Sequence, residues 1–214
     1  MKTVPLEQAV ELIPDGASVM VGGFMGVGTP ERLMDELVRQ GRRDLTVIAN
    51  DTARPGRGIG KLVSNGVASR AIVSHIGLNP ETQQKMIAGE LEVELVPQGT
   101  LIERIRAAGF GLGGILTATG VGTMVEENKR KIELDGAQYL LEPALKADFA
   151  LVESFLADYY GNLVYALTAR NFNPVIAMAA RTVIVDAAHI VPVGMISPDH
   201  VVTPAVLVDY VVAH

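Results

Sequence analysis

Short apolar runs alternate with helix-like segments along most of the chain, and this alternation constrains the fold more than any other feature. The runs predicted as strands are Ala17–Val21, Leu45–Ala49, Arg70–Ser74 and Leu91–Val96. The segments predicted as helices are Leu6–Leu12, Glu31–Arg39, Ile59–Ser64, Glu81–Ala88 and Thr100–Ala108. Strands separated by helices are typical of an α/β fold with an open, mostly parallel sheet and flanking helices.

Residues with known preferences for helix ends support these boundaries. Thr29 is expected to cap the helix that follows it, with Pro30 at the first helical position. Thr100 and Glu103 have the spacing of a capping box, in which Thr100 is the N-cap. Gly89 is expected at the C-terminal end of the helix that precedes it.

The alternation changes after Gly109. The stretch GFGLGGILTATGVGT is rich in glycine and is predicted to be a loop. Asp135-Gly136 lies between the apolar runs 131–134 and 138–141 and predicts a hairpin. Further strands are predicted at Phe149–Val152, at Val183–Asp186 and near Val206–Val212. We therefore expect a single domain over residues 1–214, with a small hairpin excursion near residues 110–145.

Composition argues against several classes of protein. The chain is 49% hydrophobic and 20% charged, which is typical of a globular protein, and its net charge of -6 argues against a nucleic-acid partner. A membrane span needs about 20 uninterrupted apolar residues, and we find no such run. The absence of cysteine fits a cytoplasmic protein. The histidines lack metal-ligand spacing, so no metal is predicted; they are His75, His189, His200 and His214.

A glycine-rich stretch, VGGFMGVGTP, joins the first predicted strand to a helix. Its spacing fails the dinucleotide-binding fingerprint, because the third position falls on Glu31. Residues 109–114 do match that fingerprint, but a helix precedes them where a strand is required. Gly60-Lys61 is followed by Leu62, which excludes a P-loop. Asp51 stands about where a ribose-binding acid would lie, but without the fingerprint it does not predict a dinucleotide.

Two interpretations of the glycine-rich stretch remain. The glycines can simply make a tight turn, since glycine tolerates positive φ and close backbone approach. Four glycines in seven residues exceed what a turn requires. A loop with so little side-chain bulk can expose amide groups to an anion, assisted by the N-terminus of the following helix. It can equally pack closely against the backbone of a partner.

The residues from Asp15 to Pro30 follow a longer pattern: Asp-Gly, a short apolar run, Gly-Gly-Phe, three residues, Gly, one residue and Pro. In this pattern the chain resembles the α subunits of family I CoA-transferases. Further segments that resemble the same family are LTVIANDTA (45–53), SHIGLNPET (74–82), LVPQGTLIERIRA (95–107), LTATGVGT (116–123) and ARNFNP (169–174). The resemblance implies a three-layer α/β/α fold.

The resemblance also implies an activity. Such enzymes move CoA from a short acyl-CoA, for example acetyl-CoA, to acetoacetate, butyrate or a similar carboxylate through a glutamyl-CoA thioester, with CoA as a co-substrate and no permanently bound cofactor. In two-subunit members the nucleophilic glutamate belongs to the β subunit, in a Ser-Glu-Asn-Gly motif. The nearest substitute in this chain is Glu126-Glu127-Asn128, and the charged residues that follow it indicate a solvated loop. We therefore expect a β-subunit partner, in an assembly of two copies of each chain.

Candidate site residues follow from the same comparison. Gln98 ends a predicted strand in a Pro-Gln-Gly context, and the resemblance places it at the thioester; Asn50, after LTVIA, is the second candidate. Both amides can donate to a developing oxyanion. The family assigns the glycine loop to CoA: Gly22, Gly23, Phe24, Met25, Gly26, Val27 and Gly28. Phe24 and Met25 would also suit a short acyl chain. Asn171 and Asn173 are expected to shape a turn before Pro174.

Two other functions remain open. One is a sugar-phosphate isomerase or deaminase of the same fold superfamily, because a fold does not determine a function. Such an enzyme needs an acid or base carboxylate in its pocket, and Asp51 is the one strand-end candidate. The other is a non-catalytic protein that binds an acyl-CoA or a partner.

Overall fold

The computed structural model describes residues 2–213, except for the side chain of Lys2, and its centre is a large sheet. The strands run in the order β1-β12-β11-β9-β2-β3-β4-β5, all parallel, with β10 added antiparallel to β9. Their bounds are β1 Lys2–Val4, β2 Ser18–Val21, β3 Leu45–Ile48, β4 Ala68–Val73, β5 Glu92–Leu95, β9 Ala147–Asp158, β10 Leu163–Val164, β11 Ala180–Val191 and β12 Tyr210–Val212. The open, mostly parallel α/β sheet is confirmed.

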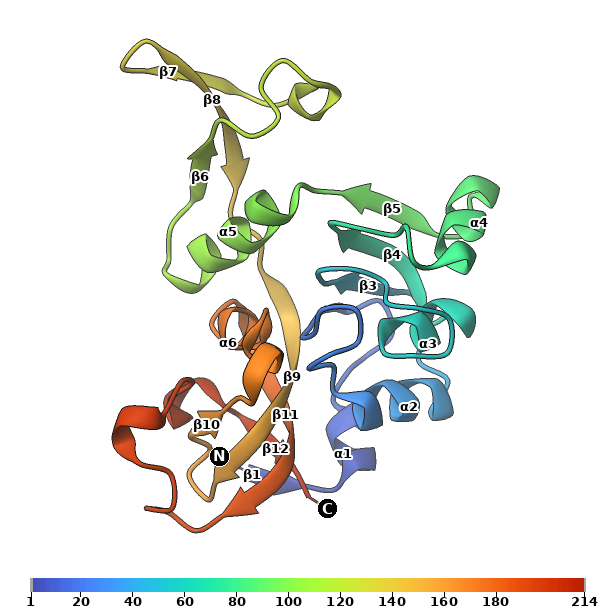
Figure 1. Ribbon diagram of the computed structural model, residues 1–214. Helices are drawn as coiled ribbons and strands as arrows, with labels where there is room; N and C mark the ends of the chain where they lie inside the picture. Colours follow the sequence, from blue (N-terminus) through green and yellow to red (C-terminus); the bar gives the residue numbers. More distant parts are fainter. Residues whose placement is uncertain (1, 214) are drawn as a thin grey trace.

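Helices cover both faces of this sheet (Figure 1). Their bounds are α1 Leu6–Glu11, α2 Glu31–Arg39, α3 Ile59–Ser64, α4 Pro80–Ala88, α5 Gln98–Gly109 and α6 Asn173–Ile176. Side chains of α1, α2 and α3 belong to one apolar core, and those of α5 and α6 belong to another. Strand β2 serves both, because Val19 and Val21 face the first core while Met20 faces the second. This alternation makes the three layers.

Two predicted helix N-caps are wrong. Helix α2 has the predicted bounds, but Pro30 takes the N-cap position and no side chain caps it. Helix α5 begins at Gln98, with Pro97 as its N-cap, so Thr100 lies inside the first turn. The Thr100 hydroxyl is buried without a hydrogen-bond partner among the described residues, and the expected capping box does not form. At α5 the fixed φ of Pro97 starts the helix before Thr100 can cap it, whereas at α2 Thr29 lies one residue before the N-cap.

Residues 110–143 form an arm that stands away from the layers (Figure 1). The arm is an antiparallel sheet of β6 Gly114–Thr117, β8 Ala137–Pro143 and β7 Lys131–Leu134, with the 3₁₀ helix η1 Met124–Glu126 between β6 and β7. The predicted hairpin is confirmed, with Asp135 and Gly136 at φ +52° and +75°. The predicted loop is wrong at 114–117, which pair with β8. Of the arm's described residues, only Leu140 is counted among the fully buried apolar side chains, and it belongs to neither core.

The C-terminal strands differ most from prediction. Strands β9 and β11 are each 12 residues long and pair along nearly their whole length, whereas only residues 149–152 and 183–186 were predicted as strands. Polar residues such as Glu153 and Ser154 interrupt the sequence pattern but not the pairing. Residues 205–207, of which 206–207 were predicted as part of the last strand, form the 3₁₀ helix η4, Ala205–Leu207. Two more 3₁₀ turns are η2 Leu167–Arg170 and η3 Pro198–His200. Among residues 2–213 no helix is long and apolar enough to cross a membrane.

Candidate active site

Four neighbouring parallel strands end at one edge of the sheet, and the residues after them make the candidate site. Gly22 follows β2, Asn50 and Asp51 follow β3 closely, Ser74 follows β4, and Gln98 comes shortly after β5. Ligands of open α/β sheets bind beyond the carboxyl ends of the strands. The sheet therefore gathers both predicted amides and the start of the glycine loop at the edge where a ligand is expected.

The two predicted amides touch. Gln98 Nε2 donates a hydrogen bond to Asn50 Oδ1 at 2.6 Å. Asn50 is buried, and Ser74 Oγ donates to its main-chain oxygen at 2.8 Å and to Oδ1 at 3.2 Å. Gln98 is exposed and is the first residue of α5, not the last residue of a strand as predicted. Since an amide nitrogen carries two hydrogens, one remains for a ligand on the open side.

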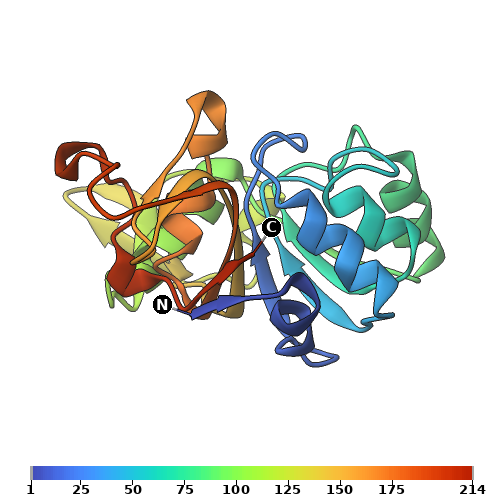
Figure 2. The ribbon, with the colours of Figure 1, turned by 90° about the horizontal axis from the view of Figure 1, so that it is seen from below.

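The glycine loop is a tight turn that projects between the segments after β3 and the η2 segment (Figure 2). Phe24 and Val27 exchange main-chain hydrogen bonds at 3.0 and 2.9 Å. Met25 and Gly26, between them, lie at φ +52° and +85°. The turn therefore places the side chains of Phe24, Met25 and Val27 outward, where each is 37–44% exposed.

Two asparagines hold this loop against the rest of the chain. Asn173 Nδ2 donates to the oxygens of Gly28 and Ala169, both at 2.8 Å, and its Oδ1 accepts from the amide of Glu153 at 3.0 Å. Asn171 accepts from the amide of Gly23 at 3.1 Å and donates to the oxygen of Val27 at 2.9 Å. The expectation of a simple turn before Pro174 missed this role.

Close packing explains the glycines of the loop. A Cβ on Gly22 would lie 1.8 Å from Asn173 Oδ1, and one on Gly28 would lie 2.9 Å from the Cα of Ala169. The loop's amides are also mostly used: those of residues 22, 23, 24, 25 and 27 donate within the chain. Of the seven predicted CoA-binding residues, only Gly26 and Gly28 have amides without a partner among the described residues. The geometry fits close packing better than an anion cradle.

Arginines flank the turn on both sides. A hollow of about 570 Å³ is lined by Phe24, Val27, Thr168, Arg170 and Asn171. A second hollow, of about 300 Å³, is lined by Phe24, Met25, Val27, Arg54 and Arg57. The three arginines that line these hollows, Arg54, Arg57 and Arg170, are exposed. Within residues 2–213, none of them forms an ion pair with an acidic side chain. An apolar turn with guanidinium groups on both sides can hold a molecule with an apolar stem and anionic groups.

Glu153 lies in a smaller hollow next to the loop. This hollow of about 220 Å³ is also lined by Thr29, Glu31, Arg32, Asp186 and Ala188. Arg32 pairs with Asp186 at 2.5 Å, whereas the buried Oε2 of Glu153 has no hydrogen-bond partner among the described residues. Burial, and then the charge of Asp186, raise the pKa of the Glu153 carboxyl.

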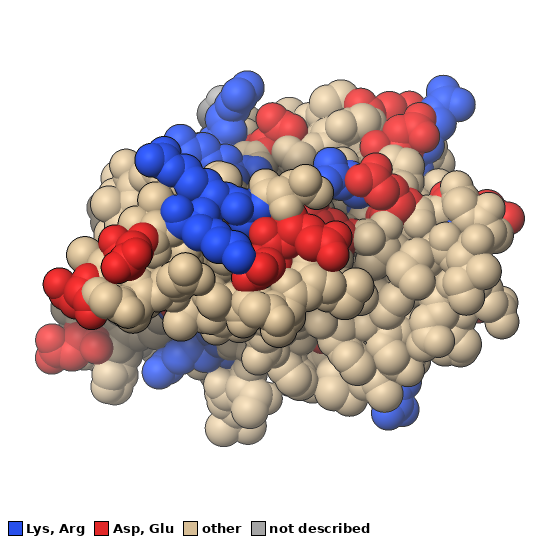
Figure 3. All heavy atoms as spheres, turned by 90° about the horizontal axis from the view of Figure 1, so that it is seen from above, with Lys and Arg blue, Asp and Glu red and all other residues tan. Residues whose placement is uncertain are grey.

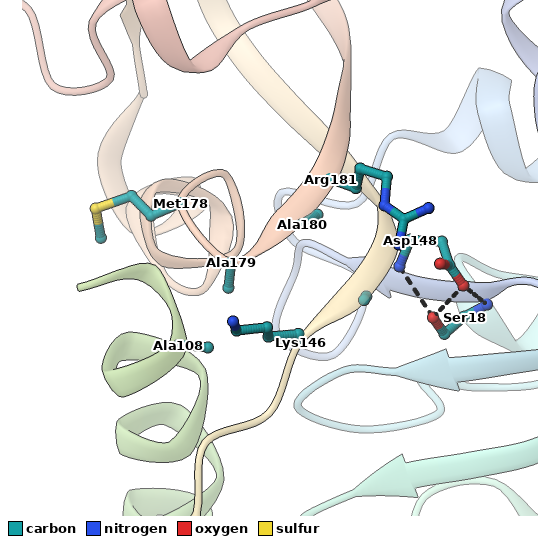
Figure 4. Close-up of a pocket in the computed structure, with 9 residues that line it drawn as sticks. Ser18, Ala108, Lys146, Asp148, Met178, Ala179, Ala180 and Arg181 are labelled. Atoms are coloured by element: carbon teal, nitrogen blue, oxygen red, sulfur yellow. Dashed lines mark hydrogen bonds between the residues drawn. The ribbon is translucent and has the colours of Figure 1, made fainter. Parts of the chain in front are cut away.

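A further hollow, of about 460 Å³, opens at the opposite, amino end of the strands (Figure 4). It is lined by the starts of β2, β9 and β11 and includes Lys146 and Arg181. Ser18 and Asp148 bind each other there: Ser18 Oγ donates to Asp148 Oδ2 at 2.6 Å, and the amide of Asp148 donates to Ser18 Oγ at 2.9 Å. The Ser18 hydrogen bonds lower the pKa of Asp148. None of the predicted site residues lines this hollow.

The remaining candidates lie elsewhere. Glu126 is on the arm, where Lys131 binds it at 2.7 Å and lowers its pKa. Figure 3 looks onto the top of the molecule in Figure 1, and basic and acidic side chains lie side by side on that face.

The ring of His189 packs edge-on against that of Phe155, with 5.4 Å between the ring centres. In the described chain, no group of three or more acidic or histidine side chains is arranged to hold a metal ion.

Comparison with known proteins shows which protein family the chain belongs to. Residues 3–214 match the family model described as Coenzyme A transferase, and the chain belongs to this family. It is 54% identical over 211 residues to the acetate CoA-transferase subunit alpha of Escherichia coli strain K12, covering 99% of this chain and 96% of that one. It is 49% identical over 211 residues to the acetoacetyl-CoA:acetate/butyrate CoA transferase alpha subunit of Clostridium acetobutylicum, covering 99% and 97%.

Solved structures with the same fold include enzymes of more than one activity. A thioester complex with CoA of the acyl-CoA transferase YdiF from E. coli O157:H7 has a TM-score of 0.87 and 25% identity, covering 99% of this chain and 49% of that one. A variant of the decarboxylase AibA/AibB has a TM-score of 0.85 and 29% identity, covering 100% and 82%. The fold alone therefore does not select the reaction.

Proposed function

We propose that this chain is the α subunit of a short-chain acyl CoA-transferase. It moves CoA from an acyl-CoA such as acetyl-CoA to acetoacetate, butyrate or a similar carboxylate. One observation carries the proposal: Gln98 and Asn50, which the family resemblance singles out, bind each other at the carboxyl edge of the sheet, and Gln98 keeps a hydrogen free on the open side. The names of the two relatives above support the substrate class.

In this proposal Gln98 donates its free amide hydrogen to the thioester oxygen as negative charge develops there, and Asn50 fixes its direction. A positioned neutral donor of this kind typically contributes about 3 kcal/mol to an acyl transfer. The exposed side chains of Phe24, Met25 and Val27 contact the acyl chain or the apolar stem of CoA. Arg54, Arg57 and Arg170 lie where they can attract the anionic groups of the ligand.

The nucleophile comes from a second chain in this proposal. A glutamate of a β subunit attacks the thioester, the glutamyl-CoA thioester forms, and the acceptor carboxylate then takes the CoA. We propose an assembly of two α and two β subunits that acts in the cytoplasm, uses CoA as a co-substrate and holds no permanent cofactor. The two named relatives are themselves alpha subunits, which supports a separate partner chain.

The structure does not favour the isomerase or deaminase alternative. That chemistry needs a carboxylate open to the substrate, and the one strand-end candidate, Asp51, has both oxygens engaged by three internal hydrogen bonds. Asp51 is also only 5% exposed. A carboxylate held in this way is not available to take a proton from a substrate.

The test is to express the chain alone and together with a candidate β subunit that carries a Ser-Glu-Asn-Gly motif. We expect CoA transfer from acetyl-CoA to acetoacetate or butyrate by the pair and none by the chain alone. Full activity of the chain alone would contradict the division of labour. Tight binding of acyl-CoA by the isolated chain in calorimetry, with no transfer by any pair, would favour a non-catalytic binding protein.

A further inference from the structure

Asp51 joins the candidate oxyanion donors to the glycine loop. Its Oδ2 accepts from Asn50 Nδ2 at 2.7 Å and from the amide of Met25 at 2.8 Å, and its Oδ1 accepts from the amide of Ala53 at 2.7 Å. Among the described side chains it has no ion-pair partner. All its contacts are therefore made to neutral donors, and such bonds to a carboxylate are the strong class of hydrogen bond.

These contacts fix the direction of the Asn50 amide. With Nδ2 held by Asp51, Oδ1 must point to the other side, where Gln98 and Ser74 donate to it. The reverse orientation would place the Asn50 NH₂ against the Gln98 NH₂, and two donors repel. Asp51 thus determines, through Asn50, where the exposed amide of Gln98 is held.

The same carboxylate holds two strained stretches of backbone. Met25 lies at φ +52° and Ala53 at φ +51°, a region that side-chain-bearing residues rarely adopt. Each of these two residues donates its amide to Asp51. Such strain persists only where the surroundings enforce it, and it tends to occur at functional sites. One buried group therefore fixes the positions of the glycine loop, the segment after β3 and the donor pair relative to one another.

We propose that Asp51 is a positioning residue for CoA transfer, acting on kcat through Asn50 and Gln98 and on the binding of the acyl-CoA through the glycine loop. This proposal rests on the proposed function. Asp51 touches neither substrate nor nucleophile in it. Its role is to keep the donor pair aligned with the turn that contacts the acyl-CoA, so that the thioester meets a donor already in place.

The test uses the complete α/β complex with Asp51→Asn, which keeps the side-chain size but replaces one acceptor oxygen by a donor. We expect kcat to fall 10- to 100-fold at temperatures where circular dichroism shows a folded complex. Asp148→Asn is the matched control, because Asp148 is also a hydrogen-bonded aspartate at a strand end but lies at the opposite edge. It should keep kcat within 2-fold.

Two readouts separate positioning from general stability. Because the effect of Asp51 on kcat runs through Gln98, the kcat of the double variant D51N/Q98A should be no more than about 2-fold below that of Q98A alone. Hydrogen exchange at Met25 and Ala53 should accelerate in D51N and stay unchanged in D148N. If D51N does not fold, Asp51→Glu takes its place and should show the same non-additivity.

Unchanged kcat in the Asp51 variant, or independent effects of D51N and Q98A, would overturn the proposal. Failure of the proposed function is a different result, namely no CoA transfer by the wild-type complex. In that case the exchange of the Met25 and Ala53 amides still decides whether Asp51 holds the two segments.

Discussion

The two ends of the parallel sheet are both hollowed, but their polar groups are organised differently. At the amino end, Ser18 and Asp148 bind each other, and within residues 2–213 no side-chain hydrogen bond joins this pair to any of the predicted site residues. At the carboxyl end, Gln98, Asn50 and Asp51 form one chain of bonds that reaches the glycine loop. A hollow of 460 Å³ is therefore a weaker sign of a site than continuity of polar contacts across neighbouring strands.

The largest expected difference between the two ends concerns catalysis. Gln98→Ala should lower kcat of the α/β complex by about 10²- to 10³-fold, because it removes a donor aimed at the developing oxyanion. Lys146→Ala, in the hollow at the amino end, is the matched control and should change kcat by less than about 2-fold. Steady-state kinetics with acetyl-CoA measure both. If Gln98→Ala and Lys146→Ala have the same kcat, the two ends of the sheet do not differ in their contribution to catalysis.

The second prediction concerns the packing of the glycine loop. Gly22→Ala should destabilise the protein by about 3 kcal/mol, because the new Cβ would displace the side chain of Asn173 from its buried hydrogen bonds. Adding Asn173→Ala should relieve this clash, so the double variant should be no less stable than Asn173→Ala alone. Urea unfolding monitored by circular dichroism measures the free energy of unfolding.

Gly113→Ala is the control for this cycle. Gly113 has no positive φ, and a Cβ at this position would meet no atom within 4 Å, so its change should stay within about 0.5 kcal/mol. Additive losses from Gly22→Ala and Asn173→Ala would show that the loop relaxes elsewhere and that Asn173 does not set its position.

The third prediction tests whether the amino end is purely structural. Ser18→Ala should cost about 1 kcal/mol of stability at neutral pH and leave kcat unchanged, since it removes both Ser18–Asp148 side-chain bonds. The pKa of Asp148 is lowered in the folded state, so its contribution is present above 3.8, the ordinary value, and is lost as the pH falls through the folded pKa. The cost of Ser18→Ala should therefore shrink in strong acid. A pH-independent cost would contradict this account.

The smallest effect is expected at Glu153. Burial raises its pKa above the ordinary 4.5, so its ionisation favours unfolding and the stability of the protein should fall as the pH rises through the folded value. Glu153→Gln should therefore be slightly more stable than wild type near neutral pH, and the gain should vanish below pH 4.5. Thermal unfolding at pH 4 and pH 8 would show this. A loss of stability at both pH values would mean that the carboxyl makes a favourable contact.

Strands β2 to β5 could be predicted from the sequence, because β2 to β4 are local apolar runs, β5 alternates acidic and apolar residues, and each has a helix on either side. Asn50 and Gln98 were predicted as separate candidates near strand ends, where ligands of α/β sheets bind, but their contact was not predicted. The start of α5 was wrong because Pro97 begins the helix before Thr100 can cap it. Strand β6 was missed because the glycines at 109, 111, 113 and 114 made this stretch look like a loop, although residues 114–117 pair with β8.

The loop contacts could not be predicted from one sequence. Asn171 and Asn173 bind segments about 145 residues earlier in the chain, and no local pattern relates the two. The same holds for Asp51, which from the sequence was a candidate only as the acid or base of an isomerase or deaminase. Its three donors come from a neighbouring side chain and from two amides whose left-handed backbone exists only in the folded state.

The order of strands also has a consequence for synthesis on the ribosome. Strands β2 to β5 are consecutive in both the sequence and the sheet, so they can pair as soon as residue 95 has emerged. Strand β1 pairs with β12, so residues 2–4 can pair only after residues 210–212 have been made. The other neighbour of β2 is β9, which also comes much later in the chain. Long-range parallel pairing is slow to form. Until β9 has emerged, the β2 edge therefore stays open, and chaperones or premature association compete for it during that interval.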